Sequence, residues 1–485
     1  MAGSSPIPQE QPLSELFAKH VLETQYSELS PDAIAQAKVF ILDTLGVGIS
    51  GSSAYGTSTI LETLTRGDKT GASTLWGHAC TASAPVAALL NAYQTHCQEY
   101  DCVHEGAVLH PLATILPAVL AYISASDAPP VSGADLILAV ALGVNVSCGL
   151  GISSRSAMRF FRPATAGGFG AVASLGRLMG LTLDELVSAF GLQYTQTSGT
   201  LQPHVEGSAA LPLQVGLNAR AALLACELAK NGMSGPRGAF DGTYGFLTLV
   251  EGPEPADLRE LREILRPKDK LSRRWLVSEI SHKPYPAGRA SHAGVEGLLI
   301  MISGGGKDGQ GKSLSTDSIA NVKITAPPLP TRLCSRPDVP NPSPNYARLC
   351  MSYIGAKVLQ HSHLDLSHYR GSELTDPVTH ELAKRIVMVS DEQEDPNALM
   401  PVSLELQMTD GTVRKWRCDE MLASPGRRLT REQHLAKFRR CWEFSIDGLG
   451  VENREKAIDM VDNLERLSNV NELLTCISAS PKSKL

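Results

Sequence analysis

The sequence predicts a mainly α-helical protein that carries a smaller α+β part. Through about residue 275 the apolar residues recur every three or four positions, as they do in helices that pack on a core. Alternation of apolar and polar residues first occurs beyond Ser281. The chain has 485 residues, 43% of them hydrophobic, so it is roughly three times as long as a typical ~150-residue domain. We therefore expect a large multihelical domain and a smaller α+β domain.

The helical elements are predicted from their caps and apolar stripes. Ser30 is a candidate N-cap, and Pro31 suits the first helical position. Capping-box spacing from Thr182 to Glu185 predicts the start of another helix. After Pro31 the apolar residues follow helical spacing, namely at Ile34, Ala37, Ile41 and Leu45.

The α+β part is predicted from alternation and turn residues. Residues 322–324 and 402–408 alternate as strands do, and Asp410-Gly411 after the second run predicts a type I′ hairpin turn. Between the two runs, Asp376-Pro377 has the form of a helix start, with the helix expected to continue over 378–389.

These patterns divide the chain into four parts. We expect a helical domain over 12–278, an α+β domain over 279–425 and C-terminal helices over 426–478. Residues 479–485 are expected to form an exposed tail.

Composition argues against several classes of protein. The 44 Lys and Arg residues against 50 Asp and Glu give a net charge of -6, and only 5% of residues are aromatic. Nucleic-acid-binding proteins usually show a basic excess and stacking aromatics, so we expect no nucleic-acid partner. The ten cysteines include no CxxC pair, which indicates free thiols in a reducing compartment.

The chain ends in Ser483-Lys484-Leu485, a tripeptide that the peroxisomal import receptor reads as an address. We therefore expect a peroxisomal protein, with a cytoplasmic one as the alternative. The most apolar stretch, 136–152, contains Asn145 and three glycines and is short for a bilayer span, so a buried core helix is expected and no membrane partner.

One short segment concentrates residues that carry acid–base chemistry. Gly106 and Pro111 favour a loop over a helix that would place two histidines as metal ligands. An imidazole oriented by a carboxylate is the usual general base, so a metal-free acid–base site is the preferred interpretation. A metal site and a solvated polar loop remain the alternatives. The residues concerned are Glu99, Asp101, His104, Glu105 and His110.

Two further segments contain basic residues. Lys283, Arg289 and His292 follow the change from helical to mixed character, and ligand pockets commonly form at such domain junctions. They predict a site for an anionic substrate, against the alternative of a basic linker. Arg162, just before a run of small residues, either adds to anion binding or forms a surface salt bridge.

With these segments in place, the chain resembles the MmgE/PrpD family, which includes 2-methylcitrate dehydratase and cis-aconitate decarboxylase. Six pieces in the same order over nearly the whole chain carry the resemblance. They are Ile41–Val47; Asp101 to Pro111 with Leu116–Ala118; Ala164–Gly167 through Arg177–Leu181; Gly216 through Gly232; Lys283–Pro286 through His292; and Asp376-Pro377 through Asp391.

The resemblance implies the MmgE/PrpD fold, in which residues 279–425 form an α+β lid and the helices over 426–478 complete the helical domain. A homodimer and a cleft between the two domains are implied as well. It also implies cofactor-free and metal-free lyase chemistry on a small carboxylate substrate. The positions that match the family's acid–base set are His110, Asp101, Lys283 and Glu99, which are the expected catalytic residues. The expected substrate-binding residues are His104, Arg162, Gln214, Arg289 and His292.

The chain departs from the cis-aconitate decarboxylase pattern at several polar positions. Phe161, Leu211, Gly288 and Leu333 stand where those relatives carry polar groups, and Gln214 stands where they carry a histidine. A buried site with fewer cations should bind fewer carboxylates, because an unpaired buried charge is strongly disfavoured.

These departures shape the expected reaction. We expect dehydration of a 2-alkylcitrate-like acid, in which His110, oriented by Asp101 or Glu99, moves the proton while Lys283 holds a carboxylate. The alternatives are decarboxylation of a cis-aconitate-like acid, isomerisation or epimerisation on the same fold, and a relative that binds a ligand without turnover. The peroxisomal address suggests acyl-derived acids or a compartmented route of secondary metabolism.

Overall fold

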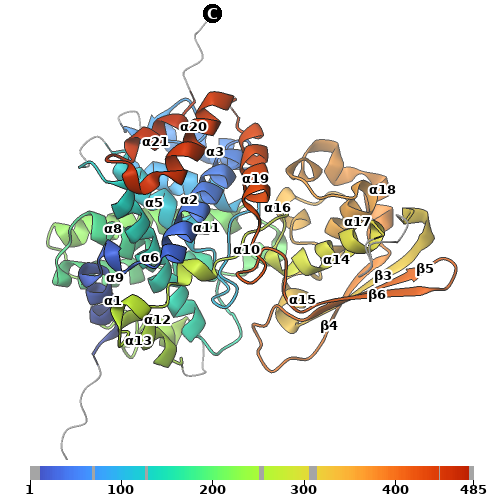
Figure 1. Cartoon of the computed structure of the whole chain (residues 1–485), viewed down its shortest axis with the longest axis horizontal. Helices are drawn as coiled ribbons and strands as arrows, with labels where there is room; N and C mark the ends of the chain where they lie inside the picture. Colours follow the sequence, from blue (N-terminus) through green and yellow to red (C-terminus); the bar gives the residue numbers. More distant parts are fainter. Residues whose placement is uncertain are drawn as a thin grey trace, which may run out of the picture.

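The computed structural model describes residues 11–67, 71–125, 129–250, 256–304, 314–446 and 448–479. Figure 1 shows two lobes, a large helical lobe and a smaller lobe built on a sheet. The C-terminal helices α19–α21 return to the helical lobe, which therefore contains both ends of the described chain. The predicted Ser-Lys-Leu address lies outside the described residues.

The helical lobe is formed mostly by the first 265 residues, with a short hairpin of β1 (Ser73–Thr74) and β2 (Thr81–Ala82). Its helices are α1 (Leu13–Glu23), α2 (Pro31–Gly51), α3 (Thr57–Thr65), α4 (Ala84–His96), α5 (Pro111–Ile123), α6 (Gly133–Ser153), α7 (Arg162–Thr165), α8 (Gly167–Leu178), α9 (Leu183–Tyr194), α10 (Gln202–Glu206), α11 (Ala210–Lys230), α12 (Phe246–Leu249), α13 (Arg259–Leu265), α19 (Arg431–Glu443), α20 (Val451–Asp462) and α21 (Asn471–Cys476).

The predicted caps of this lobe are confirmed. The Ser30 side chain accepts a hydrogen bond from the backbone N–H of Ala33 at the start of α2. Thr182 and Glu185 form the reciprocal capping box of α9. A cap of this kind contributes about 1 kcal/mol because it satisfies donors that the first helical turn leaves unpaired.

Close approach of helices builds the core around α2, α4, α5, α6, α8 and α11. A Cβ on Gly51 would lie only 2.0 Å from the carbonyl oxygen of Gln94, so α2 and α4 meet where only glycine fits. Helices α2 and α6 are long and apolar enough to cross a membrane by length and composition, but 94% of the most apolar window of α6 is buried inside the protein. Helix α6 is thus the buried core helix expected over 136–152.

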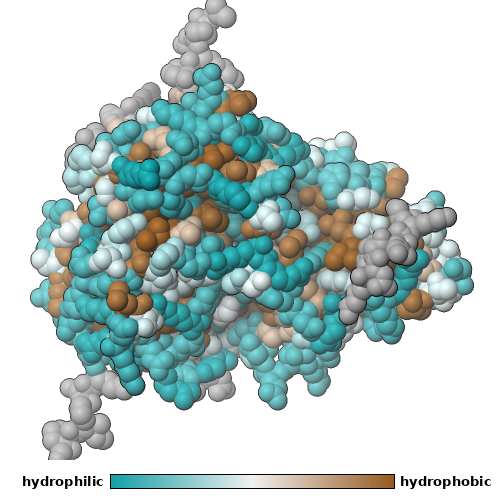
Figure 2. All heavy atoms as spheres, in the orientation of Figure 1, coloured by the Kyte–Doolittle hydropathy of each residue, from teal (hydrophilic) through white to brown (hydrophobic). Residues whose placement is uncertain are grey.

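Hydrophilic residues cover most of the face drawn in Figure 2, and hydrophobic residues form only short patches on it. The apolar side chains lie instead mainly in two cores, one in each lobe, and a small third cluster contains residues of both lobes. The core of the smaller lobe is formed by apolar residues that lie between Ala287 and Met421 in the sequence.

The smaller lobe has a four-stranded mixed sheet in the order β4-β3-β5-β6, made of β3 (Ile319–Ala326), β4 (Ile386–Ser390), β5 (Val402–Met408) and β6 (Val413–Cys418). Strand β3 pairs parallel with β4, and the other pairs are antiparallel. Alternate residues of β3 and β5 are buried, as the sequence predicted. The sheet packs against α14 (His292–Ile302), α15 (Pro328–Cys334) and α17 (Met351–His361), and α16 (Pro344–Ala347) and α18 (Pro377–Ala383) contribute residues to the same core.

Two local predictions for this lobe are wrong. The helix that Asp376 caps ends at Ala383, and residues 386–390 form β4 because Ile386 and Met388 bury their side chains against the lobe's core. The β5–β6 turn is not type I′. Gly411 has a φ of +86° but Asp410 is not left-handed, so the connection fits a three-residue loop with glycine in the left-handed position.

The segment that joins the lobes is also tied to the helical lobe. Ser281 and Val103 exchange two backbone hydrogen bonds of 2.8 and 3.0 Å. The bonds place the basic segment after Ser281 directly beside the acid-rich loop that precedes α5.

Candidate active site

The loop between α4 and α5 brings the predicted acid–base residues together. It ends at His110, the residue before Pro111 of α5. Glu99 and Val108 each have a φ of +51°, a left-handed backbone conformation that residues other than glycine rarely adopt. Such backbone strain persists only where the surroundings hold it, and it clusters at functional sites.

Asp101 lies between two imidazoles at the centre of this loop. Its Oδ2 atom is 2.9 Å from Nδ1 of His96 and 3.3 Å from Nδ1 of His110. His110 also donates its Nδ1–H to the carbonyl oxygen of Cys102 at 2.9 Å, since a carbonyl only accepts. The Nε2 atom of neutral His110 is therefore its basic nitrogen.

Lys283 closes the same cluster from the segment that joins the lobes. Its ammonium lies 2.8 Å from Glu99 and 3.8 Å from Asp101, and the side chain is fully buried. Burial alone would raise the pKa of both carboxyls. The positive charge of Lys283 reverses this for Glu99 and lowers its pKa to about 2, and the neighbouring histidines and Lys283 hold the pKa of Asp101 well below its usual range.

The two histidines differ in their protonation. Burial disfavours both imidazolium ions, but the charges of Asp101 and Glu99 prevail at His96 and raise its pKa. Burial prevails at His110, assisted by the charge of Lys283, and lowers its pKa. The shifts therefore favour the imidazolium form at His96 and the neutral ring, with a free acceptor nitrogen, at His110.

Arg289 forms a second ion pair next to this cluster. Its Nε and Nη2 atoms donate to Glu105 at 2.9 and 2.7 Å, and Ser281 donates its hydroxyl to the same carboxylate oxygen. His292 lies behind Arg289, where its Nε2–H donates to the carbonyl oxygen of Ala287. Burial lowers the pKa of His292 far below its usual value, so it supports the arginine as a neutral ring.

These groups border a cavity between the two lobes, as the resemblance implied. Four of its lining side chains are ionisable, and the others are mainly apolar. Among the predicted site residues, Glu99, His110 and Arg289 reach its wall. The full lining is Glu99, Val103, Val108, His110, Met158, Phe161, Pro163, Leu201, His204, Gly288, Arg289, Ala290, Leu333, Cys334, Leu349 and Leu399.

Three predicted residues stand one layer behind the wall: Asp101, Lys283 and His292 contact lining residues without lining the cavity themselves. Their contribution is to set the charge and orientation of His110, Glu99 and Arg289.

Three other predicted substrate-binding residues are used elsewhere. His104 accepts the backbone N–H of Ala107 at 3.1 Å, and Arg162 donates to the carbonyl oxygen of Ala107 at 3.0 Å. The side-chain amide of Gln214 accepts a hydrogen bond from the backbone N–H of Thr200 and donates one to its carbonyl oxygen. None of the three lines the cavity; each instead forms hydrogen bonds with nearby backbone groups.

The positions where the chain departs from the decarboxylase pattern shape the cavity. Phe161, Gly288 and Leu333 all line it, and the ring of Phe161 lies 5.4 Å from that of His96. Leu211 is 2% exposed and belongs to the core of the helical lobe. Three of the positions that the resemblance assigned to polar groups in the relatives thus present apolar side chains or backbone to the cavity in this chain.

Sequence reasoning missed two histidines of the site. His96 ends α4, and its only sequence signal is its place five residues before Asp101. His204 reaches the cavity from α10, and burial together with Arg336 lowers its pKa to about 4. Nothing in the sequence links His204 to the other residues, since the fold alone brings it there.

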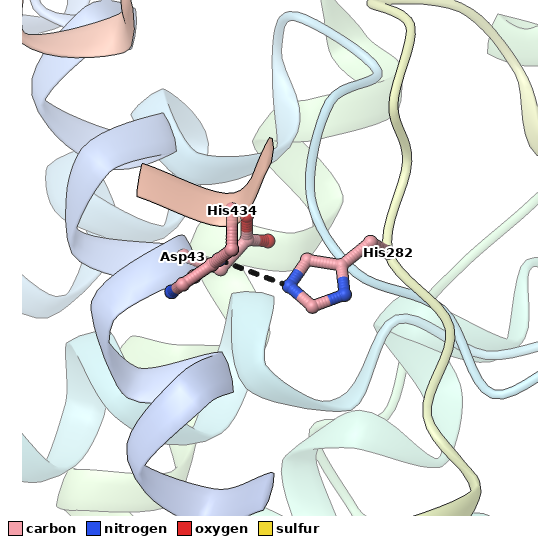
Figure 3. A group of neighbouring side chains, drawn as sticks. All are labelled: Asp43, His282 and His434. Carbon is pink, nitrogen blue, oxygen red and sulfur yellow. Dashed lines mark hydrogen bonds between the residues drawn. The ribbon is translucent and has the colours of Figure 1, made fainter. Parts of the chain in front are cut away.

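A second cluster of the same residue types lies outside the cavity (Figure 3). Asp43 of α2, His434 of α19 and His282 face one another, and His282 and His434 share a hydrogen bond of 3.2 Å. Lys437 forms a 2.7 Å ion pair with Asp43 and donates to the carbonyl oxygen of Tyr100 at 2.8 Å. The cluster therefore anchors α19 to the acid-rich loop.

Both clusters place ligand-type atoms within 4.8 Å of one another, namely those of His96, Asp101 and His110 and those of Asp43, His282 and His434. In each case a lysine ammonium already lies beside the carboxylate. A cation that entered either cluster would meet that positive charge, so the residues suit proton transfer and ion pairing better than metal binding.

The comparisons with known proteins cover almost the entire chain. The model of the MmgE/PrpD N-terminal domain matches residues 15–259, and that of the MmgE/PrpD C-terminal domain matches residues 285–466.

Three relatives span the full length of the chain at low identity. Cis-aconitate decarboxylase of Mus musculus is 24% identical over 478 residues, which cover 95% of this chain and 93% of that protein. The cis-aconitate decarboxylase-like protein oryM of Aspergillus oryzae is 24% identical over 476 residues, or 94% and 95% of the two chains. Cis-aconitate decarboxylase of Aspergillus terreus is 25% identical over 482 residues, or 94% of each.

Proposed function

The chain belongs to the MmgE/PrpD family, and on that premise we propose that it is a lyase that decarboxylates an unsaturated polycarboxylic acid. The observation that carries the proposal is His110 on the wall of the interlobe cavity, fixed by Asp101 and the carbonyl of Cys102. The named relatives are cis-aconitate decarboxylases, so they favour this reaction over the dehydration expected from the sequence.

The reaction requires one proton and no redox partner. The bond to the leaving carboxylate breaks as carbon dioxide departs, and its electron pair forms a new double bond. The original double bond shifts at the same time, and its far carbon takes up a proton. His110 is the proton donor in this proposal, since it is the imidazole on the cavity wall that a carboxylate orients.

Substrate charge makes His110 a suitable acid. Burial keeps its pKa low in the empty site. A bound carboxylate within about 4–6 Å favours the imidazolium and raises that pKa, so the substrate itself recruits the proton. His96, whose pKa is raised, supplies a second protonated ring on the other side of Asp101.

The charge and polarity of the cavity wall restrict which substrates can bind. Arg289 is the guanidinium on the wall, and Glu105 already neutralises part of its charge. Phe161, Leu333 and Leu349 present apolar surface. These features support an unsaturated polycarboxylic acid that carries an apolar portion, such as an alkylated cis-aconitate.

One observation favours dehydration as a second candidate. Neutral His110 has a free Nε2 acceptor and suits a general base that removes a proton next to a carboxylate. An elimination would then release water instead of carbon dioxide from a hydroxy acid.

Carbon-13 NMR of purified protein with labelled cis-aconitate, an alkylated cis-aconitate, citrate and 2-methylcitrate separates these reactions. The proposal predicts labelled carbon dioxide from at least one unsaturated acid, with the alkylated acid preferred. Release of water from a hydroxy acid, without loss of a carboxyl carbon, would replace it with the dehydratase. No conversion of any of the four acids would contradict both.

A further inference from the structure

A second hollow lies between the lobes and shares no lining residue with the catalytic cavity. It is an open groove of about 610 Å³. One side comes from the end of α2 and the residues after it, and the other comes from the smaller lobe. Its lining is Ser53, Ala54, Tyr55, Asn341, Pro342, Ser343, Pro344, Arg348, Tyr369, Arg370, Gly371 and Leu374.

Arg348 is the unusual residue of this groove. Its side chain is 2% exposed, and its Nε–H has no hydrogen-bond partner. Within the described part of the chain, no carboxylate forms an ion pair with it. The ring of Tyr369 lies 4.7 Å from its guanidinium, and the hydroxyl of Tyr369 is also buried without a partner. A guanidinium has five N–H donors, and burying such a charge without a counter-ion is strongly unfavourable.

Arg370 adds a second guanidinium to the same wall. It donates to the hydroxyl of Ser53 at 2.8 Å and lies 4.5 Å over the ring of Phe444. Burial and the nearby charge of Arg348 both lower the pKa of Arg370. The two like charges therefore oppose each other in the empty groove, and an anion between them would relieve that repulsion.

The acids near this pair are already engaged. Glu99 acts electrostatically on Arg348 but is bound to Lys283. Asp365 acts on Arg370 but forms two hydrogen bonds of 2.8 and 2.9 Å with Arg440. Among the residues that the structure describes, neither arginine has a carboxylate of its own. Two such arginines with spare donors form a site for an oxyanion, since guanidinium groups bind carboxylate and phosphate in a bidentate manner.

We propose that the groove of Arg348, Tyr369 and Arg370 is a second binding site for an oxyanion, either a di- or tricarboxylate or a phosphate, separate from the catalytic cavity. The site is connected to the cavity through the backbone. The carbonyl oxygen of Arg348 accepts the N–H of Gly288 at 3.0 Å, and Gly288 lines the cavity together with Leu349. An anion in the groove therefore acts on two neighbours of the catalytic wall.

Titration calorimetry tests the site without turnover. The probes are tricarballylate, a saturated tricarboxylate that has neither a double bond nor a hydroxyl group, and inorganic phosphate. The protein is the His110→Ala variant and the same variant with Arg370→Gln. We expect Arg370→Gln to weaken binding at the groove by about 10- to 100-fold, because it removes a charge-assisted, bidentate donor.

Two further variants sharpen the test. Arg370→Lys keeps the charge and should restore part of the affinity. Arg431→Gln removes an exposed arginine paired with Asp462 and should leave binding unchanged. Binding of phosphate alone would identify the ligand as phosphate, and binding of tricarballylate alone would identify it as a carboxylate.

Equal binding of both probes with and without Arg370, or no second site for either probe, would overturn the proposal. Because the experiment needs no reaction, its result is independent of the decarboxylase assignment. Failure of the NMR assay to show carbon dioxide would leave this titration as it stands.

Discussion

The two carboxylate–histidine clusters contain the same residue types but differ in their environment. His96, Asp101 and His110 with Lys283 border the interlobe cavity, whereas Asp43, His282 and His434 with Lys437 are sealed between α2 and α19. At the cavity, one histidine pKa is raised and the other is lowered. In the sealed cluster, burial lowers both, that of His434 to about 3.

The difference shows that access and net charge decide what such a cluster can do. The cavity cluster has two carboxylates, Glu99 and Asp101, around one lysine, so it can stabilise a proton on an imidazole and exchange it with a ligand. The sealed cluster has one carboxylate, and Lys437 already neutralises it. Its histidines are neutral and act as packing and hydrogen-bonding groups.

The largest expected effect comes from a substitution that breaks the ion pair between Lys437 and Asp43 in the sealed cluster. Lys437→Met leaves the carboxylate of Asp43 buried without a counter-ion, and we expect the free energy of unfolding to fall by about 3–5 kcal/mol. Urea denaturation of the two proteins measures the difference. Asp43→Asn combined with Lys437→Met removes both charges and should recover most of the loss. A loss below about 1 kcal/mol in the single variant would show that this pair is not structural.

The next effect concerns the carboxylate of the cavity cluster. Asp101→Asn removes the charge that orients His110 and favours the proton on His96, and we expect turnover of the substrate found by NMR to fall roughly 100-fold. The pH dependence of kcat/KM should also shift toward acid, because both imidazolium ions lose stabilisation. Asp43→Asn is the matched control, which should lower stability and leave the pH profile of kcat/KM in place. An unshifted profile in Asp101→Asn would remove Asp101 from the mechanism.

A smaller effect is the pH dependence of stability, which should have opposite signs for His434 of the sealed cluster and His96 of the cavity cluster. The folded pKa of His434 is about 3 against about 6.5 unfolded, so the unfolded chain binds more protons below pH 6.5. Its contribution lowers the free energy of unfolding by about 2 kcal/mol between pH 8 and pH 5. The folded pKa of His96 is raised, so its stabilisation is complete below pH 6.5 and is lost as pH rises through that folded pKa.

Urea denaturation at pH 5 and pH 8 of the wild type, His434→Gln and His96→Gln measures both contributions. We expect His434→Gln to reduce the loss of stability at pH 5 and His96→Gln to be relatively more destabilising at pH 5 than at pH 8. The same sign for both variants would contradict the assigned protonation states.

Much of the fold follows from local signals in the sequence. Caps at Ser30 and Thr182 and the alternation of residues 402–408 predict their elements directly, because these signals act within a few residues. The helix predicted to continue to 389 fails because Ile386 and Met388 gain more by burial in the sheet of the smaller lobe than by helical continuation. That gain depends on pairing with β3, more than 60 residues earlier, so the local sequence does not reveal it.

The site was predictable where its residues are adjacent in sequence. Glu99, Asp101 and His110 share one loop, and Lys283 was found from its place at the domain junction. His204 reaches the cavity only through the packing of the lobes, which also places the buried guanidinium of Arg348 in the separate groove. Gln214 stands where the resemblance implies a histidine in the relatives, and its side chain turns to Thr200, which only the structure shows.

The most direct test of the central claim is the deuterium content of the product formed in deuterated water by the wild type, His110→Ala and His434→Ala. If His110 delivers the proton, the wild type and His434→Ala form product with one solvent-derived deuterium at comparable rates per folded molecule, and His110→Ala forms it at least about 100-fold more slowly. Equal rates in the wild type and His110→Ala, or a loss of turnover confined to His434→Ala, would contradict the assignment of catalysis to the cavity cluster.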